Sequence, residues 1–145
     1  MLHERFGVEP PAADKLAAPE HTLAAGLAHA LRGDAGQRAV IAAALGRPDA
    51  QRSAGSVWMP AVLGVLMDDP YDAVRYMAGR ALKSLPDVDS SALDYDPVPR
   101  PDTRPPFAPR AARLSSLTHQ QSERVGQTVT RLLPSRDDRA VMLLE

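Results

Sequence analysis

Three aspartates in one short stretch are the residues whose types and spacing could do chemistry. Asp68, Asp69 and Asp72 lie in the segment MDDPYDAVRYMAGRAL, residues 67–82. Carboxylates this close together can bind a divalent cation or act as a general acid and base. The same residue types also begin helices. Asp69 is predicted as an N-cap, Pro70 as the first helical residue and Asp72 as part of the first turn. We predict the structural role, because a proline in that position suits a capped helix.

Arg75 follows Val74 in an apolar ladder, so its guanidinium is expected at the edge of a buried face. We predict that it pairs with a carboxylate of the adjacent helical pair, either Asp69 or Asp34. Contact with another protein is the alternative. For Trp58, an interface position and a buried position between helical pairs are both open. The candidate interaction residues are Trp58, Tyr71, Arg75 and Arg80.

Several catalytic and cofactor chemistries lack the residues that they need. The chain has no cysteine, which excludes disulfides, thiolate metal sites, a cysteine nucleophile and a covalently attached c-type haem. The histidines have no chelating spacing, the serines have no GxSxG context, and there is no glycine-rich phosphate loop. We therefore predict that this chain is not an enzyme and that it binds no metal or cofactor of its own.

The charge of the chain is nearly balanced but unevenly distributed. The formal net charge is −1, with 13 acidic and 9 basic side chains before residue 97 and 5 acidic and 8 basic side chains from there on. A field that attracts nucleic acid is not expected. No apolar run has the length of a membrane span, and no signal peptide is recognised at the N-terminus. A cytoplasmic location is expected, or a periplasmic one if the chain belongs to an exported cytochrome.

The apolar periodicity predicts an all-α protein. Alanine and leucine dominate, and runs of β-branched residues are absent. Asp34 with Gln37 and Thr118 with Gln121 have the spacing of a capping box, so Asp34 and Thr118 are predicted as N-caps. Residues 47–56 are expected to form a polar loop. The predicted helices span residues 20–32, 34–45, 56–67, 70–85 and 118–133.

A proline-rich segment separates the last predicted helix from the others. Residues 86–109 contain seven prolines and are expected to form an extended strap. Tyr95 and Phe107 are its two large side chains and the predicted anchors. The chain is accordingly divided into an N-terminal extension (1–19), a helical region (20–86), the strap (87–109) and a C-terminal helix with a tail (110–145).

The two central helical pairs form an internal repeat that resembles a known family. Arg38 matches Arg75 at an offset of 37 residues. The segment WMPAVLGVLMDDPYDAVRYMAGRALKSLP resembles a HEAT repeat, and GDAGQRAVIAAALG is similar to a shorter copy. The resemblance implies a short α-solenoid of two helical hairpins. The positions that carry it are Pro60, Val62, Val65, Leu66, Asp69, Val74, Arg75, Ala78, Ala81 and Leu82.

A narrower resemblance concerns the order of the segments. The repeats, the strap with its Tyr95-Asp96 pair and the final RDDR (136–139) resemble the C-terminal HEAT region of bacterial multihaem c-type cytochromes. This chain departs from that pattern because it has no CxxCH motif. The resemblance implies a scaffolding or protein-binding module, with a cytochrome c or a second copy of the chain as partner. The alternatives are a subunit of the phycobilin-lyase type and a haem-binding electron-transfer subunit.

Overall fold

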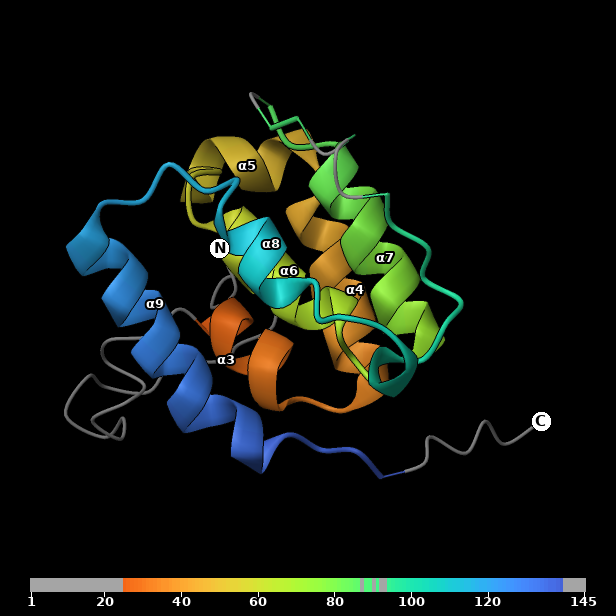
Figure 1. The fold of residues 1–145 in the computed structure, drawn as a ribbon. Coiled ribbons are helices and arrows are strands. Elements are labelled where there is room, and N and C mark those ends of the chain that lie inside the picture. The colour runs from red at the N-terminus through yellow and green to blue at the C-terminus, as the bar shows by residue number, and fades with distance from the viewer. Residues whose placement is uncertain (1–24, 87, 90, 92–93, 140–145) are drawn as a thin grey trace, which may run out of the picture.

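The computed structural model describes residues 25–86, 88–89, 91 and 94–139. In these residues all regular secondary structure is helical, which confirms the all-α class (Figure 1). The α-helices are α3 (Ala25–Arg32), α4 (Ala35–Leu45), α5 (Pro48–Ala54), α6 (Met59–Met67), α7 (Asp72–Lys83), α8 (Ala108–Ala112) and α9 (His119–Leu132); two short 3-10 helices, η3 and η4, cover Pro101–Thr103 and Leu133–Ser135.

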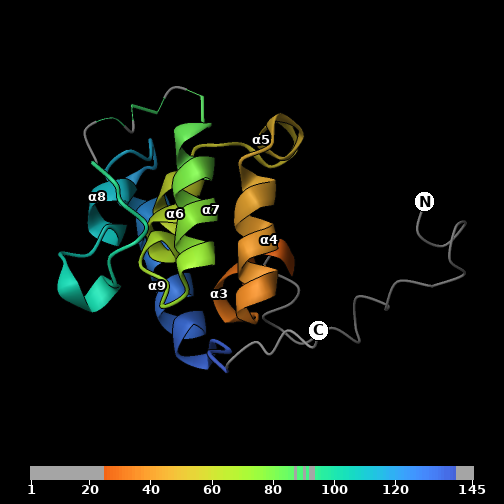
Figure 2. The same ribbon diagram turned by 90° about the vertical axis from the view of Figure 1, so that its right-hand side faces the viewer.

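The centre of the fold consists of two helical pairs, α3 with α4 and α6 with α7. The pairs pack on each other most extensively through α4 and α7, which lie side by side in Figure 2. Small side chains allow this close approach. At the end of α4, a Cβ on Gly46 would lie 3.0 Å from the Cα of Ala81. The shared core is apolar and includes Ala42, Met59, Leu63, Leu66, Val74, Ala78 and Leu82.

The observed helices differ from the predicted ones at several places, and α7 ends at Lys83, two residues before the predicted end. Within the predicted strap, η3 and the start of α8 are helical. Residues 48–54, expected within a polar loop, form α5, because Pro48 suits the first helical turn and alanines follow it. Helix α5 ends at Gly55, whose φ of 72° favours glycine. Helix α6 begins at Met59, three residues later than predicted, and α7 begins at Asp72, two residues later. Residues 20–24 of the first predicted helix lie outside the described residues.

The proline-rich strap is anchored by the two aromatic residues predicted for that purpose. The rings of Tyr95 and Phe107 meet edge to face, with centroids 4.7 Å apart, and both pack against the central core. The Tyr95 hydroxyl donates to the backbone carbonyl of Arg75 at 2.9 Å and lies 3.3 Å from the carbonyl oxygen of Met67. Because burial disfavours the charged phenolate, the pKa of Tyr95 is raised above its usual value. Beyond Phe107 the chain forms α8, which packs against α6.

Helix α9 packs against α3 and α6, and Leu132 is its buried residue (Figure 1). Thr118 and Gln121 form the capping box that their spacing indicates at its start, and Asp34 and Gln37 do the same for α4. None of the described helices combines the length and the apolar character that a membrane crossing requires.

Gly64 in α6 tests how tightly α6 and α8 pack, and Gly126 in α9 is its control. A Cβ on Gly64 would lie 2.6 Å from the Cβ of Ala111 and 3.1 Å from the Cα of Ala108, whereas a Cβ on Gly126 in α9 meets nothing within 4 Å. We expect Gly64→Ala to destabilise the protein by about 1–3 kcal/mol through overpacking. Gly126→Ala should stabilise it by about 0.5–1 kcal/mol through helix propensity. Urea unfolding of both variants measures the difference. Equal effects would show that α8 does not pack on α6 in this way.

Candidate functional site

A wholly buried arginine lies between the two helical pairs. Arg38, on α4, donates from Nε to Oδ2 of Asp69 at 2.8 Å and from Nη2 to Oδ1 of the same carboxylate at 3.1 Å. Its Nη1 donates to the backbone carbonyl of Gly33 at 2.6 Å. Two further bonds reach the C-terminal segment, at the carbonyl of Asp137 and the carboxylate of Asp138. All five N–H donors of a guanidinium therefore have acceptors.

The predicted capping role of Asp69 and Pro70 is wrong. The residue that precedes α7 is Tyr71, and its side chain makes no capping bond. The Asp69 carboxylate binds Arg38 instead and also accepts the backbone N–H of Tyr71 at 3.0 Å, which closes a local turn. Burial explains the difference, because a charged carboxylate removed from water needs a cation more than a helix start needs a cap.

Arg75 does not pair with a carboxylate as predicted. Its buried guanidinium donates to four backbone carbonyls, and among the described residues no ion pair is found for it. Two of the carbonyls, those of Asp69 and Pro70, belong to the turn before α7. The other two belong to Pro97 and Val98 of the strap, at 2.7 and 3.2 Å. Arg75 therefore fixes the path of the strap across α7.

Asp68 caps a helix that is distant in sequence. Its carboxylate accepts the backbone N–H groups of Phe107 and Ala108, at 3.0 and 2.8 Å, at the start of α8. It also accepts a bond from Arg104 at 2.8 Å. The Arg104 guanidinium stacks over the Phe107 ring, 4.4 Å from its centroid. The Nε of Arg104 is the one buried side-chain polar atom without a partner in the described part of the chain.

The three neighbouring aspartates Asp68, Asp69 and Asp72 therefore do not share a site. Asp68 caps α8, and Asp69 pairs with Arg38. Asp72 accepts the N–H of Ala73 in the first turn of α7. Within the residues that the structure describes, no group of three or more His, Cys, Asp or Glu side chains is placed to hold a metal ion.

The other predicted interaction residues differ in how accessible they are. Trp58 is half-buried against the core, and its indole N–H donates to the carbonyl of Ala54. Tyr71 is half-buried under the Arg38 guanidinium, 5.7 Å from its ring centroid, and its hydroxyl contacts the C-terminal segment. Arg80 is exposed and lies over the ring of Tyr76, 5.8 Å from its centroid.

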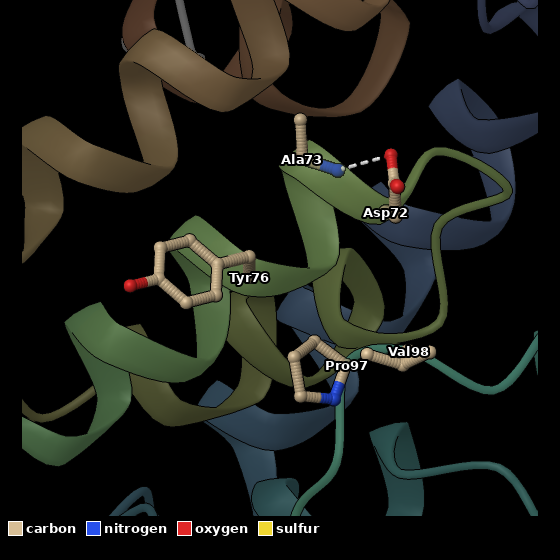
Figure 3. Close-up of a pocket in the computed structure, with 5 residues that line it drawn as sticks. All are labelled: Asp72, Ala73, Tyr76, Pro97 and Val98. Atoms are coloured by element: carbon tan, nitrogen blue, oxygen red, sulfur yellow. Dashed lines mark hydrogen bonds between the residues drawn. The ribbon is translucent and has the colours of Figure 1, made fainter.

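An exposed apolar surface accompanies Arg80 on the outer side of α7. The side chain of Tyr76 is 50% exposed and that of Val98 is 77% exposed. Figure 3 shows them, with Ala73 and Pro97, around an open cavity of about 310 Å³ whose one charged lining residue is Asp72. We call these five lining residues the α7 patch. The patch was not predicted from the sequence, although the position of Tyr76, one residue after Arg75 and off the apolar stripe, was a usable signal.

The C-terminal segment Arg136–Arg139 completes the surroundings of Arg38. Arg136 pairs with Asp138, and Arg139 pairs with Asp137 at 2.6 Å. The hydrogen bonds from Arg139 lower the pKa of Asp137 to about 2. The segment is bound to the body through Asp137, whose N–H donates to the carbonyl of Arg32 at 3.0 Å. The RDDR pattern was noted in the sequence, but its contact with Arg38 was not foreseen.

Comparison of the chain with protein-family models, with curated proteins and with solved structures finds no match. The function must therefore be argued from these contacts.

The buried and the exposed ion pairs of this chain should differ sharply in their effect on stability. Asp69→Asn removes the buried carboxylate that pairs with Arg38 and leaves only the partly exposed Asp138 carboxylate beside that charge, so we expect a loss of about 3 kcal/mol or more in the free energy of unfolding. The control is Asp49→Asn, which breaks an exposed pair with Arg52 on α5 and should cost less than about 1 kcal/mol. Urea unfolding at neutral pH measures both. Similar small losses would show that the Arg38–Asp69 pair is dispensable.

The Asp137–Arg139 pair should be visible in a pH titration. The pKa of Asp137 is about 2 in the folded protein against a usual 3.8. A depressed folded pKa contributes stability that is present above about pH 4 and is lost as the pH falls towards 2. Carboxyl carbon NMR should give the low pKa, and Arg139→Gln should move it back towards the usual value. An unchanged pKa in Arg139→Gln would exclude this pairing in solution.

Proposed function

We propose that this protein is a non-catalytic protein-binding module whose helical pairs form a short HEAT-like α-solenoid. In this arrangement the buried Arg38–Asp69 pair ties one hairpin to the next, and the strap and α8 close the far side. The extensive packing of α4 on α7 supports the proposal, as does the anchoring of the strap through Arg75, Tyr95 and Phe107.

The observation that carries the binding role is the α7 patch. Single exposed apolar residues are common on protein surfaces, but grouped ones mark contact sites. Here an aromatic ring, a proline and a valine line one open cavity. The cavity is open to solvent rather than enclosing, and its volume, at the lower end of the range for ligand pockets, suits one or two side chains of a partner.

The chemistry of the α7 patch indicates what its partner presents. Tyr76, Pro97 and Val98 offer apolar surface, and the Asp72 carboxylate adds a negative charge at one side. Within the described part of the chain, the one hydrogen bond found for the Asp72 carboxylate comes from the Ala73 N–H. A segment with an apolar side chain beside a lysine or arginine satisfies both features. Arg80, which covers Tyr76, is expected at the rim of the interface.

The narrower alternatives remain predictions from the sequence. A cytochrome c as partner, a phycobilin-lyase type of subunit and direct haem binding are not distinguished by the contacts described above. A visible absorption spectrum of the purified protein, before and after addition of haem, tests the last of these directly.

The α7 patch is tested by capture of partners from a lysate of the source cells. The double variant Tyr76→Ser/Val98→Ser should lose a partner that the unchanged protein retains, with little loss of stability because both side chains are exposed. The matched control is Val57→Ser, since Val57 is 47% exposed and lies outside the patch. Quantitative mass spectrometry compares the three samples. Recovery of the same proteins by the double variant and by the unchanged protein would refute this surface.

A further inference from the structure

The outward side of Arg38 presents two oriented hydrogen-bond donors. The body of the protein holds the guanidinium through Asp69 and the Gly33 carbonyl, which use three of its five N–H groups. The remaining two donate to the carbonyl of Asp137, at 2.8 Å, and to Oδ1 of Asp138, at 3.2 Å. Three bonds thus fix the orientation of the fork before the C-terminal segment contributes. A fixed guanidinium of this kind is suited to bind a carbonyl and a carboxylate together.

The rest of the contact recognises main chain. The Asp137 N–H donates to the carbonyl of Arg32 at 3.0 Å. On the other side, the hydroxyl of Tyr71 lies 3.1 Å from the carbonyl oxygens of both Asp138 and Arg139. Recognition by main-chain bonds together with one specific side chain is how proteins commonly bind extended peptides.

The segment itself has the character of a ligand laid on a surface. Residues 136–139 have no apolar side chain that could anchor them in the core. Most of their charge pairs lie within the segment, Arg136 with Asp138 and Arg139 with Asp137, and Arg136 Nη1 also lies 3.8 Å from Oδ2 of Asp69. The Asp138 side chain, whose carboxylate reaches Arg38, is still 43% exposed. An equivalent segment from another molecule could therefore make the same contacts.

We propose that Arg38, Tyr71 and the Arg32 carbonyl form a docking site for an extended, aspartate-containing segment of a partner protein, and that residues 136–139 are its internal ligand. The partner carries an aspartate in the place of Asp138, because Arg38 offers a positive fork at that position alone. The internal ligand is covalently attached and competes at a high effective concentration. It therefore blocks the site until a partner with additional contacts replaces it. The proposal rests on the protein-binding role proposed above but uses none of the α7 patch residues.

The experiment uses the full-length chain and a fluorescent peptide, SRDDR, that copies residues 135–139. In Asp138→Ala the internal ligand lacks its carboxylate, so we expect the peptide to bind this variant at least tenfold more tightly than it binds the unchanged protein. The peptide SRDAR, which lacks the second aspartate, is the matched control. Its affinity for Asp138→Ala should be no higher than its affinity for the unchanged protein. Asp138→Asn provides a second variant of nearly unchanged shape. Equal affinity of SRDDR for the unchanged protein and both variants would overturn the proposal.

Displacement is read separately from binding. On saturation of Asp138→Ala with SRDDR, the backbone amide of Asp137 should lose its bond to Arg32 and exchange its hydrogen faster. Binding that leaves this amide protected would place the peptide elsewhere and refute the site. The α7 patch variant Tyr76→Ser/Val98→Ser, combined with Asp138→Ala, should bind SRDDR as Asp138→Ala does. Failure of the lysate experiment and failure of this one are therefore distinguishable.

Discussion

The rest of the structure depends on one buried charge pair, that of Arg38 and Asp69. The two residues are 31 positions apart, on α4 and in the turn before α7, and both are almost completely removed from water. Burying either charge alone is unfavourable by several kcal/mol. The turn before α7 and the α4 surface can therefore meet in few ways, since any shift leaves a charge without its counterpart. The pair contributes to the choice of arrangement more than to net stability.

The position of the strap depends on a second buried arginine, Arg75 on α7, which has no carboxylate partner among the described residues. Counting 31 positions beyond Arg75, as from Arg38 to Asp69, leads to Pro106, which has no charge to offer. Carbonyl oxygens of the turn and of the strap take the role of the carboxylate. Proline-rich chain suits this purpose, because an extended backbone leaves its carbonyls free for outside donors. The buried Arg75 charge thus keeps the strap against α7.

Local features of this fold could be predicted from the sequence, and contacts between distant segments could not. The capping boxes at Asp34 and Thr118 depend on residues three apart, and the buried stripe from Val74 to Leu82 depends on helical spacing. The partner of Asp69 is set by which helices pack together, and the local pattern at Pro70 favoured a cap instead. Asp68 shows the same limit, since its role at α8 depends on a residue 40 positions away. The repeat did supply one usable signal, the equivalence of Arg38 and Arg75, but it could not show which of them had a carboxylate within reach.

The buried contacts of Arg75 also determine which side chains are exposed in the α7 patch. The backbone carbonyl of Val98 accepts a bond from Arg75, while the side chain of the same residue is exposed in the α7 patch. Tyr76, the next residue after Arg75 on α7, faces outward as a consequence of the helical turn that directs Arg75 inward. The buried guanidinium therefore helps to position two apolar members of the patch, Tyr76 through the helix and Val98 through the strap. If the α7 patch binds a partner as proposed, its fixed backbone would need little further ordering on association, which would reduce the entropic cost of binding.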